Sequence, residues 1–136
     1  MENLKKTLLI AEDNLGIQEV YKKVFGREGF NIVLCDNAAQ AMAELSEQKI
    51  DLLITDLEMP LANTFELFPF LKEKFPNLPV IIVTGHYKDF QSEFAQKGFR
   101  MSAFFNKPIG VFTLLDKVRE VLKMEKTAAS TAKSVK

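Results

Sequence analysis

Residues 52–60 read LLITDLEMP, a short apolar run that ends in an aspartate and is closed by a proline. The unbroken run from Leu52 to Thr55 is typical of a strand buried on both faces of a parallel sheet. The carboxylate of Asp56 then stands where that strand ends, and Pro60 separates the strand from the next element. The stretch therefore predicts a buried parallel strand with an acidic group at its carboxyl end.

The same pattern of a short apolar run followed by polar residues recurs on both sides of this stretch. Further strands are predicted at Thr7–Ala11, Asn31–Cys35, Val80–Val83 and Ala103–Phe105. Apolar residues at helical spacing predict helices that begin after Asn14, after Asp36 or Asn37, near Phe65 and at Gly110. A polar, weakly periodic stretch from Asp89 to Lys97 predicts a short further helix. Five strands alternating with five helices indicate an α/β fold, a doubly wound parallel sheet with helices on both faces.

Bulk properties limit the other possibilities. At 136 residues the chain is about one domain long, and its 18 basic and 18 acidic residues balance, so net charge favours neither nucleic acid nor an anionic membrane. Cys35 is the only cysteine, which excludes an internal disulfide and a cysteine-based zinc site. No signal peptide or membrane-length apolar run is evident, so we expect a cytoplasmic protein. Residues 127–136 lack apolar periodicity and are predicted to be a flexible tail or linker.

Charged and hydroxyl side chains follow four of the five predicted strands. In a doubly wound sheet, ligands bind at the carboxyl ends of the strands, so these side chains should converge. Three carboxylates in one pocket repel one another unless a cation is bound, and Mg²⁺, or Mn²⁺ in its place, suits an all-oxygen site. An aspartate can also attack phosphorus, with a lysine offsetting the charge. The residues are Glu12, Asp13, Asp56, Thr84 and Lys107.

These residues occur in motifs that resemble the receiver domain of two-component response regulators. The motifs are Glu12-Asp13, ITDLEMP around Asp56, IIVTG with Thr84, and FFNKP with Lys107. The resemblance extends over residues 4–126 and implies a sheet of strand order 2-1-3-4-5. It also implies that Asp56 accepts a phosphoryl group from a sensor histidine kinase or a phosphotransfer protein.

The resemblance assigns roles to the remaining residues. Thr84 and Lys107 would contact the phosphoryl group, and Phe104 would move inward together with Thr84. A downstream effector would be bound by the surface of the fourth helix, fifth strand and fifth helix, without direct contact to nucleic acid or membrane. The ligands of the metal would be Glu12, Asp13, Asp56 and the backbone carbonyl of Glu58.

Near the predicted site, one residue has a plainer interpretation and two features depart from the family pattern. His86, the only histidine, is expected to be a solvent-exposed loop residue, and a role in tuning access to the site, shared with Glu58, is the alternative. Phe104 cannot donate a hydroxyl hydrogen bond, unlike the tyrosine that some relatives have there. The loop LANTF after Pro60 also departs from the Gly-rich pattern of the family.

Three other functions compete with this interpretation. Asp56-Leu57-Glu58 resembles the DxD pair of haloacid-dehalogenase-like phosphohydrolases, but that family carries the pair on its first strand. A flavin or nucleotide binder would need a Gly- or Ser/Thr-rich loop after the first strand, where this chain has acidic residues. A receiver-like interaction module that does not use phosphate is the third alternative, and a phosphorylation assay discriminates it.

Overall fold

The computed structural model describes residues 5–57, 64–85, 98–99 and 101–123, and they form a parallel five-stranded sheet of order β2-β1-β3-β4-β5. The strands are β1 (Thr7–Ala11), β2 (Asn31–Cys35), β3 (Leu52–Thr55), β4 (Val80–Thr84) and β5 (Ala103–Asn106). The helices are α1 (Leu15–Arg27), α2 (Ala38–Glu47), α3 (Thr64–Lys74) and α5 (Val111–Leu122). The predicted fold class and strand order are confirmed, whereas the helix expected at 89–97 and the expected tail lie outside the described residues.

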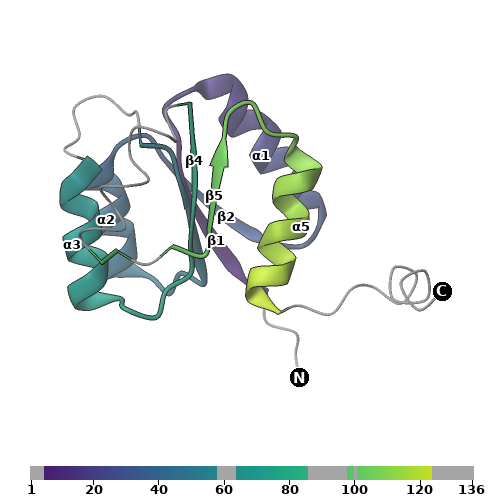
Figure 1. Cartoon of the computed structure of the whole chain (residues 1–136). Helices are drawn as coiled ribbons and strands as arrows, with labels where there is room; N and C mark the ends of the chain where they lie inside the picture. The colour runs from purple at the N-terminus through teal and green to yellow at the C-terminus, as the bar shows by residue number, and fades with distance from the viewer. Residues whose placement is uncertain (1–4, 58–63, 86–97, 100, 124–136) are drawn as a thin grey trace.

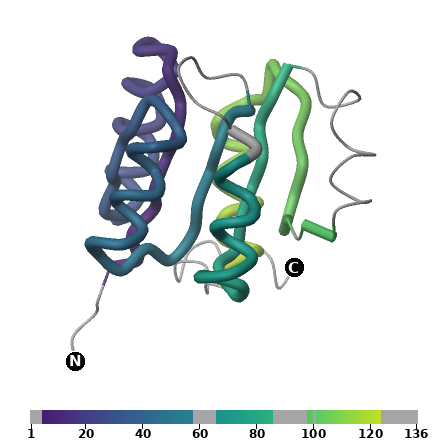
Figure 2. Tube along the Cα trace, turned by 90° about the vertical axis from the view of Figure 1, so that its left-hand side faces the viewer, coloured from purple at the N-terminus to yellow at the C-terminus, as the bar shows by residue number. Residues whose placement is uncertain are grey.

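Helices cover both faces of the sheet, with α1 and α5 on one face and α2 and α3 on the other (Figure 1). Two apolar clusters fill the space between the layers. One cluster packs Leu9, Leu53 and Ile82 against the α2 and α3 side, and the other packs Ile10, Ile54 and Ile81 against the α1 and α5 side. The order of the strands leaves β5 at an edge of the sheet, as the side view in Figure 2 shows.

The alternation of side chains along each strand sorts the predicted site residues by face. Glu12 and Asp56 stand two residues beyond Ile10 and Ile54, so they continue the row that faces α1 and α5. Thr84 continues the row of Ile82, which faces α2 and α3. Three carboxylate or hydroxyl positions are thus divided between the two faces by strand period alone.

Side-chain caps set where the first two helices begin. The Asn14 side chain accepts a hydrogen bond from the Ile17 amide at 2.9 Å, and the Asn37 side chain accepts one from the Gln40 amide at 2.8 Å. Asn37 is therefore the cap of α2, which the sequence left open between two residues. After α1, Gly29 takes a φ of 97°, a left-handed conformation that glycine adopts without steric cost.

Several predicted boundaries were wrong by one or two residues. β4 extends to Thr84 and β5 to Asn106, because parallel pairing continues to that rung of the ladder. α5 begins at Val111, with Gly110 as its cap, and ends at Leu122 because Lys123 has a left-handed φ of 56°.

Pro69 lies within α3, where its ring is exposed and its missing N–H removes one helical hydrogen bond without ending the helix.

Cys35, the last residue of β2, is predicted to resist alkylation in the folded protein. Its side chain is buried, and burial together with the charges of Glu44 and Asp36 raises the pKa of the thiol to about 12. At pH 8 the thiolate fraction should be about a thousandfold below that of an ordinary cysteine. The rate of colour formation with a disulfide reagent, compared with that in urea, measures this. Equal rates in the two solvents would contradict the buried position of the thiol.

Candidate functional site

Three carboxylates gather where β1 and β3 end. Glu12 and Asp13 follow β1, Asp56 follows β3, and one oxygen from each lies within 4.8 Å of the others. Glu12 and Asp56 are buried, with 3% and 4% of their surface exposed, whereas Asp13 is exposed. The cluster therefore combines two buried acids with one that is open to solvent.

Lys107, which follows β5, links the two buried acids. Its Nζ lies 2.9 Å from Oδ2 of Asp56 and 3.1 Å from Oε1 of Glu12. The lysine side chain keeps 25% of its surface exposed, whereas that of Asp56 keeps 4%. The peptide bond from Lys107 to Pro108 is cis. One cation thus contacts two of the three carboxylates.

The main chain of each of these residues is bonded to a neighbouring strand. The amide of Glu12 donates to the carbonyl of Cys35 at 2.9 Å, and the amide of Asp56 donates to that of Ala11 at 3.0 Å. The amide of Lys107 donates to the carbonyl of Thr84 at 2.8 Å. The ladder of the parallel sheet therefore continues one residue past the strands and holds the peptide groups of the site.

The pKa values of Glu12 and Lys107 are both raised, but by different causes. Burial is the main cause that raises the pKa of Glu12, and the Asp56 charge adds to it, while the Asn14 amide and Lys107 act in the opposite direction. Burial by itself would lower the pKa of Lys107, but hydrogen bonds and attraction to Asp56 and Glu12 outweigh it and raise that pKa. Lys107 is therefore firmly cationic at neutral pH.

The donor set fits a hard divalent cation. All three side chains offer oxygen, and the oxygens are close enough to share one ion of the size of Mg²⁺. Tyr21 of α1 is buried, and burial together with the charge of Glu12 raises the pKa of its hydroxyl to about 12. The phenol therefore stays neutral and adds no charge to the acidic cluster.

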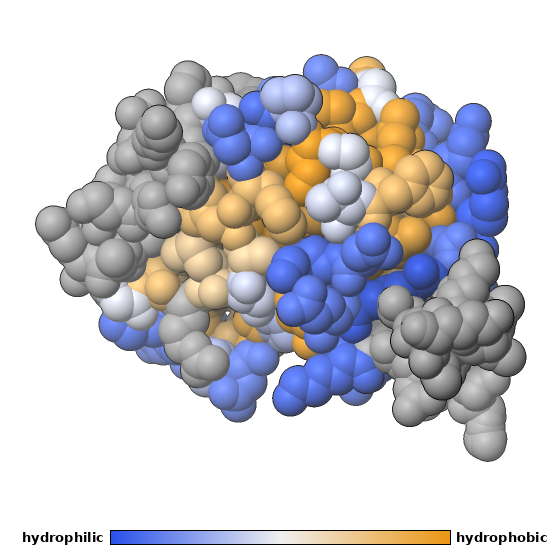
Figure 3. All heavy atoms as spheres, turned by 45° about the vertical axis from the view of Figure 1, so that its right-hand side comes forward, coloured by the Kyte–Doolittle hydropathy of each residue, from blue (hydrophilic) through white to orange (hydrophobic). Residues whose placement is uncertain are grey.

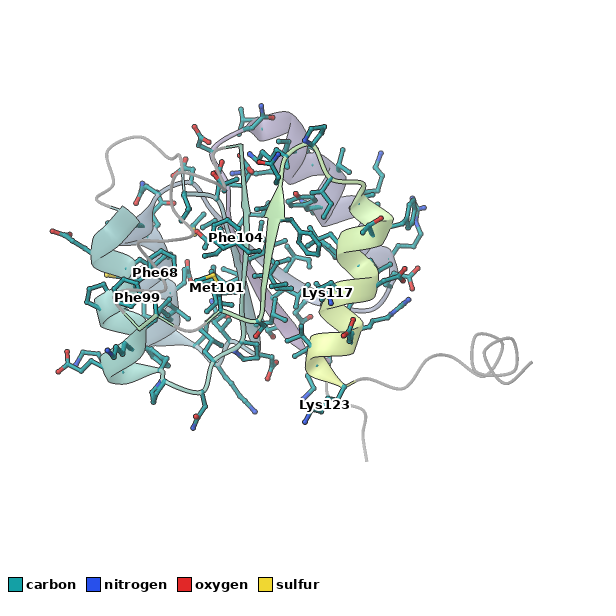
Figure 4. The ribbon with its side chains drawn as sticks, in the orientation of Figure 1. Phe68, Phe99, Met101, Phe104, Lys117 and Lys123 are labelled. Atoms are coloured by element: carbon teal, nitrogen blue, oxygen red, sulfur yellow. The ribbon has the colours of Figure 1, made fainter. Side chains whose placement is uncertain are left out.

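Two further predicted residues lie on the other face of the sheet. Thr84 ends β4, is fully buried, and accepts the Lys107 amide through its carbonyl. Phe104 pairs with Ile82 in the register of β4 and β5 and packs on the α2 and α3 side of the sheet. Figure 4 shows Phe104 on β5, above Met101 and to the right of Phe68 and Phe99. Glu58 and His86 lie outside the described residues.

Two polar residues of the site were missed by reasoning from sequence. The backbone amide of Asn14 donates to Oε2 of Glu12 at 3.0 Å, and the side-chain amide of Gln18 donates to the backbone carbonyl of Glu12. Asn14 was assigned only as a helix cap. A glutamine in the second turn of a helix is usually a solvated surface residue, so its spacing of six from Glu12 carried no signal.

The structure also limits the relation of this chain to membranes. Among the helices within the described ranges, none combines the length and the apolar character that crossing a bilayer requires.

Comparison with known proteins identifies the family. The family model described as the response regulator receiver domain matches residues 8–119. A DNA-binding transcriptional regulator NtrC from Bradyrhizobium sp. is 38% identical over 79 residues, which are 58% of this chain and 16% of that protein. Sporulation initiation phosphotransferase F of Bacillus subtilis is 25% identical over 122 residues, 90% of this chain and 98% of the relative.

A solved structure agrees with this assignment. The response regulator receiver domain protein (CheY-like) from Methanospirillum hungatei superposes with a TM-score of 0.80 and 25% identity, covering 88% of this chain and 95% of that one. Receiver domains generally bind Mg²⁺, in line with the acidic cluster here. The chain spans only 16% of the length of the NtrC relative. The chain belongs to the response regulator receiver domains, the phosphoryl-accepting signalling domains of two-component systems.

Proposed function

We propose that Asp56 is the phosphoryl acceptor of this receiver domain and that a phosphohistidine on a sensor kinase or phosphotransfer protein is the donor. The observation that carries the proposal is the contact of 2.9 Å between the buried Asp56 carboxylate and the Lys107 ammonium, within a cluster of three acids. The ammonium lies against the carboxylate that would attack, so positive charge is already in place beside the transferring group.

The proposed reaction is a direct transfer. A carboxylate oxygen of Asp56 attacks the phosphorus, a P–O bond forms, and the P–N bond to the donor imidazole breaks, so the imidazole nitrogen leaves with the electron pair. Lys107 offsets negative charge on the oxygens of the transferring group. Its second contact, with Glu12, keeps the ammonium at the pocket when Asp56 turns toward the donor.

The proposed metal ligands are Glu12, Asp13 and Asp56, together with the backbone carbonyl of Glu58. A divalent cation bound there, Mg²⁺ or Mn²⁺, would supply positive charge to the phosphoryl oxygens. The oxygen-only donor set supports this choice, because hard cations prefer carboxylates and water over nitrogen and sulfur. The exposed position of Asp13 leaves that side of the pocket open to solvent.

A groove beside the pocket supports a docking place for the donor protein. Apolar side chains gather on part of the face shown in Figure 3. The exposed large apolar residues include Leu15 and Val20 of α1 and Phe112 of α5. A groove of about 450 Å³ runs between α1 and the start of α5. Its lining includes Lys107, so a protein that fills the groove with apolar side chains brings its own histidine close to Asp56. We propose that the donor docks on this groove.

The test of the proposed function is phosphorylation of the purified chain. With a small acyl phosphate or a phosphorylated histidine protein and Mg²⁺, intact mass should rise by one phosphoryl group, and the label should be lost in base. Chelation of the metal should suppress the label. If several donors leave the mass unchanged in the presence of Mg²⁺, the phosphate-independent interaction module becomes the better account.

Thr84 and Phe104 are proposed to pass the phosphorylated state to the effector surface. A switch needs a contact that differs in free energy between its two states, and the hydroxyl of Thr84 can supply it to a bound phosphoryl group. In Thr84→Val, the amide shift changes that beryllofluoride causes at Phe104 should be mostly lost. Thr7→Val, at the other end of the sheet, should keep them. Equal responses in Thr84→Val and the wild type would contradict the proposed coupling between Thr84 and Phe104.

The proposed extent of the domain is 4–126, with residues 127–136 as a tail or a linker. The family match over residues 8–119 supports the core of that range. In this proposal the chain acts as a signalling domain, which assists its own phosphorylation and dephosphorylation and does not turn over a substrate of its own. The downstream effector is proposed to bind the surface that includes β5 and α5.

A further inference from the structure

Gln18 contacts the acidic loop twice from one position in α1. Its backbone amide donates to the carbonyl of Asn14 at 3.0 Å, and its side-chain amide donates to the carbonyl of Glu12. The first bond is the ordinary helical one. The second reaches past the helix end to the peptide group that joins Glu12 to Asp13. Gln18 thus holds both ends of the three-residue loop between β1 and α1.

That peptide group controls the direction of Asp13. Glu12 is held by the carboxylate contacts to Lys107 and the Asn14 amide, and Asp56 is held by Lys107. Asp13 differs, because within the described residues no hydrogen bond or ion pair restrains its exposed carboxylate. Its orientation therefore depends on its own backbone, and the carbonyl of the preceding residue is the point at which Gln18 fixes that backbone.

We infer that Gln18 is a positioning residue for the cation site, which aims the Asp13 carboxylate without touching the cation. The inference rests on the proposed metal site at Glu12, Asp13 and Asp56. Mg²⁺ requires near-octahedral geometry at short distances and so is sensitive to ligand direction, whereas Ca²⁺ accepts a looser arrangement. Loss of the Gln18 contact should therefore weaken Mg²⁺ binding more than Ca²⁺ binding.

The ratio of the two affinities separates this role from a structural one. Gln18→Met keeps the length, the volume and the helix propensity of the side chain but removes the donor. A variant that merely loosened α1 would weaken both ions together and lower the melting temperature. The matched control is Gln40→Met, because Gln40 also makes a side-chain bond at the start of a helix, to the Asp36 amide at 3.0 Å, but belongs to α2.

The experiment is titration of Mg²⁺ and of Ca²⁺ into each protein, followed by amide shifts, with the melting temperature measured in parallel. Gln18→Met should bind Mg²⁺ about two- to tenfold more weakly, as expected for one lost hydrogen bond. Its Mg²⁺ to Ca²⁺ affinity ratio should fall, and its melting temperature should drop only by the few degrees that one lost hydrogen bond causes, as in Gln40→Met. Gln40→Met should bind both ions as the wild type does.

The outcomes separate this inference from the site on which it rests. Asp13→Asn should lose Mg²⁺ affinity if the site is assigned correctly. If the wild type binds no Mg²⁺, or Asp13→Asn binds it equally well, the metal site is wrong and the inference goes with it. If Asp13→Asn loses affinity but Gln18→Met does not, the positioning role alone is overturned. Equal weakening for both ions in Gln18→Met also overturns that role.

Discussion

Asp56→Asn is expected to abolish phosphoryl incorporation while leaving the protein folded. The substitution preserves the size of the side chain but replaces an attacking carboxylate oxygen with an amide nitrogen. Lys107 would still have Glu12 as a partner at 3.1 Å, so its ammonium would remain paired. The backbone bond from residue 56 to the carbonyl of Ala11 would also persist. Intact mass after incubation with acyl phosphate and Mg²⁺, together with a thermal melt, measures both expectations.

Asp51→Asn is the matched control for this experiment. Asp51 stands just before β3 as Asp56 stands just after it, and its carboxylate accepts the Thr7 amide at 2.7 Å at the opposite end of the sheet. This variant should take up the label at the wild-type level, even if it melts earlier. Undiminished label in Asp56→Asn would show that the acceptor is another residue.

Lys107→Met is expected to slow phosphoryl transfer by about a hundredfold or more, the usual effect of removing one preorganised charge at a transferring group. The same ammonium contacts Asp56 and Glu12, so its loss also leaves two buried carboxylates without their cation. A divalent cation should then bind at least as tightly as in the wild type, because a competing positive charge has left the pocket. Transfer rates and metal titrations on one protein stock measure the two effects.

Slow transfer together with retained metal binding would show that Lys107 acts on the transferring group itself and not through the metal site. Lys117→Met is the matched control, since Lys117 has 31% of its side chain exposed against 25% for Lys107 and pairs with Glu120 on α5. It should transfer at the wild-type rate. If Lys107→Met transfers as fast as Lys117→Met, the charge at the pocket is not needed for the reaction.

The elements that the sequence predicted well are those whose apolar pattern has no second explanation. The runs at β1 and β3 are too short for helices and too apolar for loops, and both begin and end where expected. The ends of β4 and β5 were misjudged because Thr84 and Asn106 look like loop residues, and only pairing with a neighbouring strand reveals them as strand. Local composition does not determine which residues pair with a neighbouring strand, so it does not predict these strand ends.

The site was predictable to the extent that it lies at strand ends. Glu12, Asp13, Asp56 and Lys107 converge because parallel strands finish at one edge, which topology dictates. Gln18 could not be found in this way, because its contribution depends on a side chain that reaches backward from a helix to a main-chain carbonyl. The charged groups therefore belong to recognisable motifs, whereas the neutral residue that bonds to their backbone belongs to none.

The extension of the sheet ladder past β1, β3 and β5 has a consequence for the entropy of the reaction. Backbone hydrogen bonds to Cys35, Ala11 and Thr84 already fix the main-chain dihedral angles at Glu12, Asp56 and Lys107, respectively. Ordering a residue's backbone costs roughly 1–2 kcal/mol, and at these three positions folding has met that cost before any donor arrives. The encounter then has to restrict only the side-chain torsions and the motion of the donor, as in an intramolecular reaction between groups held in place.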